Sequence, residues 1–176
     1  MHDNLIIRDE VADDADAIAE VTVDAFRTLA ISRHTEQFIV AALRAARSLA
    51  VSLVAELDGK VVGHIAFSPV TISDGTTGWY GLGPVSVTPA LQGRGIGSAL
   101  IKAGLDRLRH ANAGGCCLAG HPAYYPRFGF RMIEGLVCEG VPPEVFLALP
   151  LAGKIPQGKV AFHPGFFVDG PPPAAG

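Results

Sequence analysis

The sequence predicts an α/β domain built on one mixed sheet, in which an antiparallel meander leads into a βαβ unit. Three features carry this prediction: a hairpin at Asp58-Gly59, a glycine-rich turn at 92–97 that opens a helix, and the apolar run Cys116–Ala119 after that helix. Asp-Gly favours a two-residue hairpin because both of its residues tolerate positive φ. A strand, a helix and a second strand in this order favour parallel pairing through a crossover helix.

Length and composition are those of one domain. The 176 residues are 49% hydrophobic, which is enough apolar surface for one sizeable core. We expect the domain to span residues 1–169 and the proline-rich segment 170–176 to form a disordered tail. The formal net charge is -3 and there is no basic block, which argues against nucleic acid as a partner.

Targeting signals and cysteines point to the cytoplasm. The first residues lack a basic region followed by an apolar segment, so neither secretion nor membrane insertion is expected. The three cysteines, two of them adjacent at Cys116 and Cys117, cannot make a disulfide framework. No histidine or further cysteine stands at metal-ligand spacing, so no metal site is predicted.

The N-terminal half predicts a strand at 5–8, two helices and the strands of the meander. The first helix begins after Asp13 and Asp14, and its apolar residues recur three and four positions apart from Ile18 to Leu29. A second helix is expected over 35–46. Alternating polarity then predicts strands at 51–57, 60–67 and 79–88, with a turn at 73–76.

The C-terminal half predicts an amphipathic helix over 97–110, a buried strand at 116–119 and less regular structure beyond it. Pro122 to Phe130 is expected to form a short helix that ends at Gly129. The apolar runs 137–139 and 145–149 supply one or two final strands.

The segment 85–98 has the design of an anion site. Its glycines let the backbone approach a ligand, and the first amides of a helix carry positive partial charge without an internal partner. The spacing of Gly93, Gly95 and Gly97 places the third glycine one residue too early for a dinucleotide fingerprint. A Walker loop would need a lysine after Gly97, where Ser98 stands.

The remaining pattern, Gln92-x-x-Gly95-x-Gly97 after Val85-Ser86-Val87, resembles the acetyl-CoA signature of the GNAT superfamily of N-acetyltransferases. The stretches 62–68, 82–87 and 124–130 resemble its YhbS-like branch, in the same order along the chain. The resemblance spans most of the sequence. It implies a mixed, mostly antiparallel sheet with helices on both faces, in which two central parallel strands splay apart to admit the pantetheine arm.

The resemblance also implies which residues hold acetyl-CoA. Backbone groups of Val85 and Val87 would pair with pantetheine as an added strand does. Arg127 and Arg131 are candidates for the CoA phosphates, with solvated surface charge as the alternative for each. The pyrophosphate loop would comprise Gln92, Gly93, Arg94, Gly95, Ile96, Gly97 and Ser98, with Arg94 contributing its amide and Ser98 adding a hydroxyl.

Acetyl transfer to an amine needs a neutral nucleophile, a polarised thioester carbonyl and a proton for the leaving thiolate. Tyr125 lies four residues before Gly129, which is the offset of the family's tyrosine near the CoA sulfur. The resemblance therefore implies that Tyr125 is the general acid, with a packed core aromatic as the alternative reading. Tyr124 lacks this offset. The backbone amide of Val85 would polarise the carbonyl.

The general base has no assigned residue. Many relatives carry a glutamate on the strand before the glycine loop, whereas 79–88 contains no acid. A water-relayed base is therefore expected, and Glu139, His64 and His121 are the candidates. An acyl-cysteine scheme through Cys116-Cys117 is disfavoured, because this pair lies in an apolar strand with no adjacent base.

These observations predict direct transfer of acetyl from acetyl-CoA to a primary amine in a ternary complex. The alternative is a non-catalytic acyl-CoA-binding or sensing module that kept the loop and lost its base. The sequence leaves the acceptor open among a small amine, an amino acid, an aminoglycoside and a protein N-terminus. The resemblance is also compatible with a homodimer.

Overall fold

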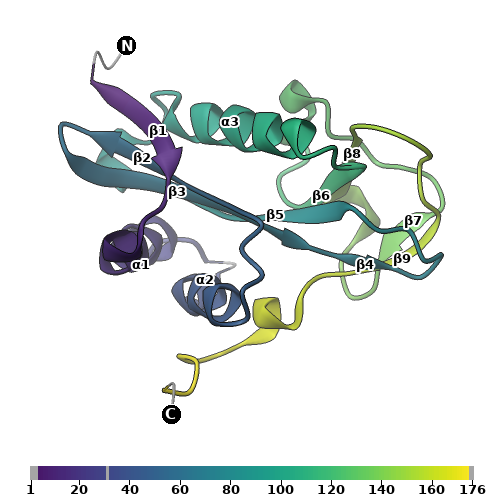
Figure 1. Cartoon of the computed structure of the whole chain (residues 1–176), viewed down its shortest axis with the longest axis horizontal. Coiled ribbons are helices and arrows are strands. Elements are labelled where there is room, and N and C mark those ends of the chain that lie inside the picture. The colour runs from purple at the N-terminus through teal and green to yellow at the C-terminus, as the bar shows by residue number, and fades with distance from the viewer. Residues whose placement is uncertain (1–3, 31, 175–176) are drawn as a thin grey trace.

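The computed structural model describes residues 4–30 and 32–174. One six-stranded sheet runs through the molecule in the order β1-β2-β3-β5-β6-β8 (Figure 1). All neighbouring pairs are antiparallel except β5 and β6, which are parallel, as predicted. The strands are β1 (Leu5–Asp9), β2 (Val51–Leu57), β3 (Lys60–Pro69), β5 (Trp79–Val87), β6 (Gly115–Ala119) and β8 (Phe146–Pro150).

The predicted domain, 1–169, and the predicted tail, 170–176, extend past the described part of the chain. Residues 1–3 and 31 of the domain and residues 175–176 of the tail lie outside the described residues. In the described part, no helix combines the length and the apolar character needed to cross a membrane.

Helices cover both faces of the sheet, which confirms the predicted layers. Helices α1 (Ala15–Phe26) and α2 (Glu36–Ala45) lie on one face, and α3 (Ile96–His110) lies on the other (Figure 1). The 3-10 turn η1 (Ala12–Asp14) leads into α1. The buried residues of α3 recur at helical spacing and pack into the main core: Ile96, Leu100, Ile101, Leu105 and Leu108.

The meander follows the predicted hairpins. Asp58 and Gly59 have φ of 50° and 77°, the left-handed conformation that a tight turn between β2 and β3 requires. The pairing of β3 with β5 shifts between Ile65 and Phe67, because Gly83 and Pro84 of β5 lie opposite the single residue Ala66 of β3. Beyond this bulge, Val85 and Val87 again pair in register with β3.

The two parallel strands separate after three paired positions. β5 pairs with β6 from Trp79–Gly115 to Gly81–Cys117, and β5 then continues to Val87 paired only with β3. At the paired end of the two strands, the Trp79 ring occupies the space that a side chain on Gly115 would need. The open end is the splay that the family resemblance implied.

A second, three-stranded sheet in the order β4-β9-β7 was not predicted. Its strands are β4 (Thr71–Ile72), β7 (Leu136–Cys138) and β9 (Gly158–Ala161). The apolar run 137–139, predicted as a strand, overlaps β7, whereas β4 and β9 are two and four residues long and too short for alternation to identify them. The predicted helix at 122–130 is one 3-10 turn, η3 (Tyr125–Phe128), which Gly129 ends with φ 96°. Further 3-10 turns are η2 (Pro89–Leu91), η4 (Pro143–Val145) and η5 (Pro164–Phe167).

Candidate active site

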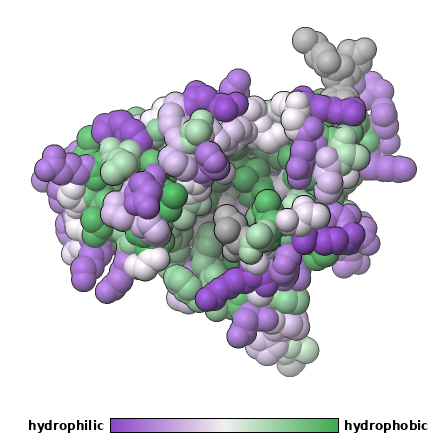
Figure 2. All heavy atoms as spheres, turned by 180° about the vertical axis from the view of Figure 1, so that it is seen from behind, coloured by the Kyte–Doolittle hydropathy of each residue, from purple (hydrophilic) through white to green (hydrophobic). Residues whose placement is uncertain are grey.

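A cleft of about 400 Å³ lies where the end of α1, the open half of β5 and the start of α3 meet. Most of its wall is apolar. The face of the molecule opposite to the view of Figure 1 is hollowed near its middle, and hydrophobic residues form the floor of the hollow (Figure 2). The cleft is lined by Ala25, Phe26, Leu29, Val85, Val87, Leu91, Gln92, Gly93, Gly95, Ile96, Gly97, Ser98, Ile101, Tyr124 and Arg127.

The glycine loop turns the chain from β5 into α3 through two left-handed residues. Gly93 has φ 74° and Gly95, the N-cap of α3, has φ 87°. A Cβ at either position would meet no atom within 4 Å, so backbone conformation rather than space requires glycine. The first helical bond joins Ala99 N to Gly95 O at 3.0 Å. The amides of the residues between them have no acceptor within the helix and carry positive partial charge.

One hydrogen bond joins this loop to the end of β5. The Gln92 side chain donates from Nε2 to the Val87 carbonyl at 3.0 Å. A Cβ on Gly97 would lie 3.7 Å from Tyr124 Oη and 3.8 Å from Val87 Cγ2, so any side chain there would narrow the cleft.

The edge of β5 beyond its pairing with β6 offers backbone groups at Val85 and Val87, of which the Val87 carbonyl also accepts from Gln92 Nε2. Thr88 N donates to Val62 O of β3 at 2.8 Å, which fixes the direction in which the backbone of Thr88 points. Because backbone groups alternate sides along a strand, those of Val85 and Val87 point away from β3. β6 has already left that side, since its pairing ends at Gly81. The backbone groups of Val85 and Val87 therefore point into the gap between β5 and β6.

The two adjacent tyrosines lie in different surroundings. Tyr124 lines the cleft, and its Oη lies 3.4 Å from Ser98 Oγ. Tyr125 is not among the described residues that line the cleft. Its ring packs edge-on against Tyr124 and Phe130, with centroids 5.1 and 6.0 Å away, and lies where a side chain on Gly120 would need to be.

Burial raises the pKa of Tyr125 to about 12, and the neighbouring Tyr124 adds to the shift. Its phenol therefore stays protonated at neutral pH, the state that a proton donor needs. The role of Tyr125 as the acid remains a prediction, and of the two tyrosines it is Tyr124 that lines the cleft.

The three candidate arginines are not gathered at one place. Arg127 lines the cleft, with its guanidinium 4.3 Å above the centre of the Tyr124 ring and its Nε donating to Tyr124 O at 2.8 Å. Arg94 and Arg131 are exposed and lie outside the cleft wall. Arg131 exchanges backbone hydrogen bonds with Ala148 of β8.

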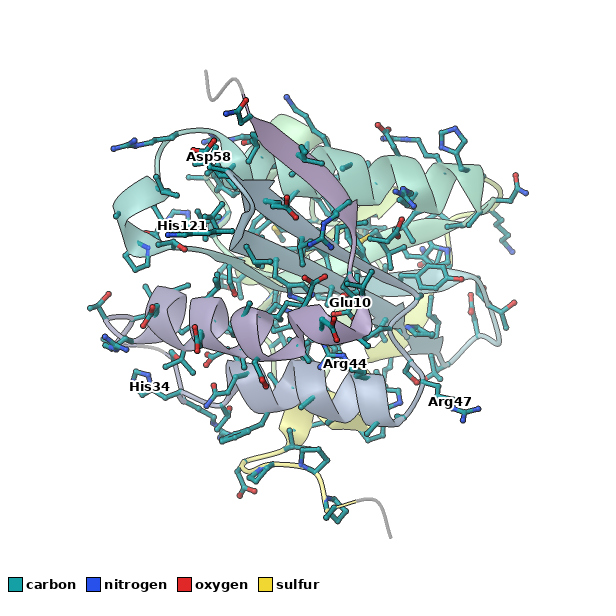
Figure 3. All side chains as sticks on the ribbon, turned by 60° about the vertical axis from the view of Figure 1, so that its left-hand side comes forward. Glu10, His34, Arg44, Arg47, Asp58 and His121 are labelled. Carbon is teal, nitrogen blue, oxygen red and sulfur yellow. The ribbon has the colours of Figure 1, made fainter. Side chains whose placement is uncertain are left out.

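None of the three base candidates lines the cleft. His64 is fully buried in β3, with Nε2 2.8 Å from Ser52 Oγ, and burial lowers its pKa to about 3. His121 lies in the exposed loop after β6, where its Nδ1 accepts from Ala123 N at 3.1 Å (Figure 3). Glu139 follows β7 and lines a separate depression beside β4 and β9.

The cysteine pair is inert in this setting. Cys116 and Cys117 are both fully buried in β6, and burial raises the pKa of each thiol well above its ordinary value. Neither forms the thiolate that an acyl-cysteine intermediate needs at neutral pH.

Comparison with known proteins gives consistent similarities. Residues 15–130 match the acetyltransferase (GNAT) family. The chain is 34% identical over 129 residues to the uncharacterised N-acetyltransferase YhbS of Escherichia coli K12, which covers 73% of this chain and 74% of that protein. It is 36% identical over 126 residues to the uncharacterised N-acetyltransferase YjhQ of the same organism, covering 69% of this chain and 67% of that protein.

Solved structures show the same likeness. A GNAT family acetyltransferase from Brucella melitensis, crystallised with acetyl-CoA, is 51% identical with a TM-score of 0.84, covering 94% of this chain and 99% of that one. YhbS of Escherichia coli, crystallised with CoA, is 31% identical with a TM-score of 0.85, covering 95% and 94%.

Proposed function

The chain belongs to the acetyltransferase (GNAT) family and is an N-acetyltransferase, and on this premise we propose that it transfers acetyl from acetyl-CoA to a primary amine. The proposed reaction is direct attack within a ternary complex. One observation carries the proposal: the free amides at the start of α3 and the unpaired backbone edge of β5 border the same cleft.

In this proposal acetyl-CoA fills the cleft. Its pyrophosphate binds the glycine loop, because a helix N-terminus with exposed amides attracts an anion. The pantetheine arm continues β5 by pairing with Val85 and Val87. Arg127 and Tyr124 stand at the wall beside the loop, where a cation and a phenol can meet the phosphates. The complexes of the two similar proteins with acetyl-CoA and CoA support this placement.

The chemical step forms a C–N bond and breaks the C–S bond of the thioester. The neutral amine attacks the carbonyl carbon, whose oxygen accepts a hydrogen bond from the amide of Val85. Tyr125 gives its phenol proton to the leaving sulfur. The nitrogen loses one proton to solvent as the amide forms. The Tyr125 phenolate takes a proton back from solvent, so the step balances.

A second candidate function is an acyl-CoA sensor without turnover. The observation that favours it is the composition of the cleft wall: none of the described residues that line it is an acid or a histidine. A sensor would bind acetyl-CoA and would leave every amine unmodified.

Two measurements test the proposed function. Calorimetry with acetyl-CoA and with CoA is expected to give saturable one-to-one binding, and absence of binding at high micromolar ligand would contradict the proposal. Release of CoA thiol is then followed with a panel of tyramine, spermidine, lysine methyl ester and kanamycin. We expect turnover with at least one of these amines, whereas tight binding without any thiol release would favour the sensor.

A further inference from the structure

Two phenylalanine rings lie over the point where β5 and β6 begin to separate. Phe162 follows β9, and Phe166 belongs to η5. A Cβ on Gly81, the last residue of β5 that pairs with β6, would lie only 2.7 Å from the Phe162 ring. A Cβ on Gly83 would lie 3.8 Å from Phe166 Cε1. The two rings form an aromatic pair over the part of β5 that carries glycine instead of side chains.

The aromatic pair lies on the face of the sheet opposite α3. Leu82 packs with residues of α3 in the main core, and alternation along β5 directs its neighbours Gly81 and Gly83 to the other face. On that face η5 packs against α2, because a Cβ on Gly165 would lie 3.2 Å from Leu43 Cδ2. Figure 1 shows the C-terminal segment, in yellow, beside α2 and away from α3. The aromatic pair therefore borders the gap between β5 and β6 from the side that α3 does not cover.

Hydrogen bonds fix the aromatic pair in this place. Phe166 N donates to His163 O at 2.9 Å, and Gly165 N donates to His163 Nδ1 at 2.9 Å. On the other side of the ring, His163 Nε2 lies 3.1 Å from the Oγ of Ser48, which follows α2. The Phe162 and Phe166 rings contact each other with centroids 5.2 Å apart. Both are only half-buried, so part of each ring stays accessible.

The proposed position of acetyl-CoA brings its thioester next to the aromatic pair. With the pyrophosphate at the glycine loop, the pantetheine arm meets Val87 first and then Val85, whose amide faces the thioester oxygen. The next residues of β5 in that direction are Pro84 and Gly83, and Phe166 lies over Gly83. Pantetheine fills the cleft on the α3 side of this point, so the acceptor nitrogen approaches from the side of the aromatic pair.

The walls around this approach carry no charge that could pair with a second ammonium group. Neither β5, nor β6, nor the segment 162–167 contains Asp, Glu, Lys or Arg. Among the described residues that line the cleft, the one charged side chain is Arg127, a cation. A second positive charge on the acceptor would lose water here without gaining a carboxylate, which is costly. An apolar group gains by the same move, because it leaves water for aromatic surface.

We propose that Phe166, backed by Phe162, binds the body of the acceptor and makes the enzyme select amines that carry one positive charge and an apolar or aromatic group. The reacting nitrogen lies at the thioester while the apolar group lies on the Phe166 ring. This inference rests on the proposed transfer to a primary amine and names the class of amine. Tyramine is the amine of the panel that fits this class, so it is the selected amine.

The first measurement compares kcat/KM across the panel. We expect tyramine to exceed spermidine and kanamycin by at least roughly tenfold, since those two amines bring further positive charges to an uncharged wall. A wild type that prefers spermidine or kanamycin to tyramine would overturn this inference and leave the proposed function intact.

Phe166→Ala tests the contact itself. We expect the ratio of kcat/KM for tyramine to kcat/KM for ethylamine to fall roughly tenfold, because ethylamine has no group large enough to cover the ring. Affinity for acetyl-CoA, measured by calorimetry, should stay unchanged. The two amines are measured on one preparation, so a misfolded fraction cancels from the ratio.

Phe167→Ala is the matched control. Phe167 is the next residue in the chain, but its side chain is 72% exposed and lines the separate depression beside β4 and β9. Loss of this ring should leave the ratio unchanged. An unchanged ratio in Phe166→Ala, or an equal fall in Phe167→Ala, would rule out the role of Phe166. A wild type that acetylates neither ethylamine nor any amine of the panel contradicts the proposed function itself.

Discussion

At the scale of single residues, the adjacent tyrosines make the sharpest comparison. Tyr125→Phe removes the proposed proton donor while keeping the ring that packs on Phe130. We expect kcat to fall roughly a hundredfold and acetyl-CoA affinity to stay nearly unchanged, measured by initial rates and calorimetry.

Tyr124→Phe is the matched control for this comparison. It removes the hydroxyl that lies near Ser98 in the cleft wall and should weaken acetyl-CoA binding more than it slows the chemical step. The opposite pattern, with a normal Tyr125→Phe rate and a slow Tyr124→Phe rate, would move the acid role to Tyr124.

His64 also contributes to the pH dependence of the free energy of unfolding. Its pKa falls from an ordinary 6.5 to about 3 because the ring is fully buried, so the unfolded chain binds a proton that the folded chain refuses. The free energy of unfolding should therefore drop as pH falls below about 6.5, by up to roughly 1.4 kcal/mol per pH unit from this residue.

Urea unfolding of wild type and His64→Gln between about pH 4 and pH 7 checks this slope. The variant should lose stability less steeply than wild type as acid is added. Equal slopes for the two proteins would show that His64 titrates alike in the folded and unfolded states.

At the scale of elements, a substitution in the glycine loop is expected to affect both stability, through backbone strain, and acetyl-CoA binding. Gly95→Ala places a side chain at φ 87° and should cost on the order of 1–2 kcal/mol of stability. It should also weaken acetyl-CoA binding, since this N-cap orients the free amides of α3. Thermal unfolding and calorimetry measure the two effects.

Gly140→Ala is the control for the loop, because Gly140 has φ 79° and, like Gly95, no neighbour within 4 Å of a Cβ. It should cost similar stability and leave acetyl-CoA affinity unchanged. Equal affinity losses in the two variants would contradict a specific role for the loop.

The helices and the hairpin could be predicted because their sequence patterns involve only residues close together in the chain. Asp58-Gly59 identified its hairpin, and apolar spacing identified α1 and α3, because turn chemistry and helical period depend on neighbours in the sequence. The splay of β5 from β6 followed only from the family resemblance. The second sheet was missed, because β4 and β9 are short and pair across almost ninety residues.

The candidate site was predicted unevenly for a similar reason. The loop 92–98 could be read from glycine spacing, and most of it lines the cleft. The positions of Phe26, at the end of α1, and of Leu29 beyond it could not be derived from spacing, because only the tertiary fold brings them to β5. The contact of His64 with Ser52 was missed as well, since it depends on the register of two strands.

At the scale of the whole molecule, the elements that border the cleft come from both faces of the sheet. The end of α1 lies on one face and the start of α3 lies on the other, with the open half of β5 between them. Acetyl-CoA is proposed to bind where these three elements meet.

Direct transfer to an amine is the central claim, and the fate of an isotope-labelled acetyl group tests it most directly. Acetyl-CoA labelled in the acetyl group is mixed with the protein and the selected amine, and mass spectrometry locates the label. We predict the label on the amine nitrogen, in step with CoA thiol release, and none on the protein at any time. Label held by the protein before it reaches the amine, or label that never leaves acetyl-CoA, would contradict direct transfer.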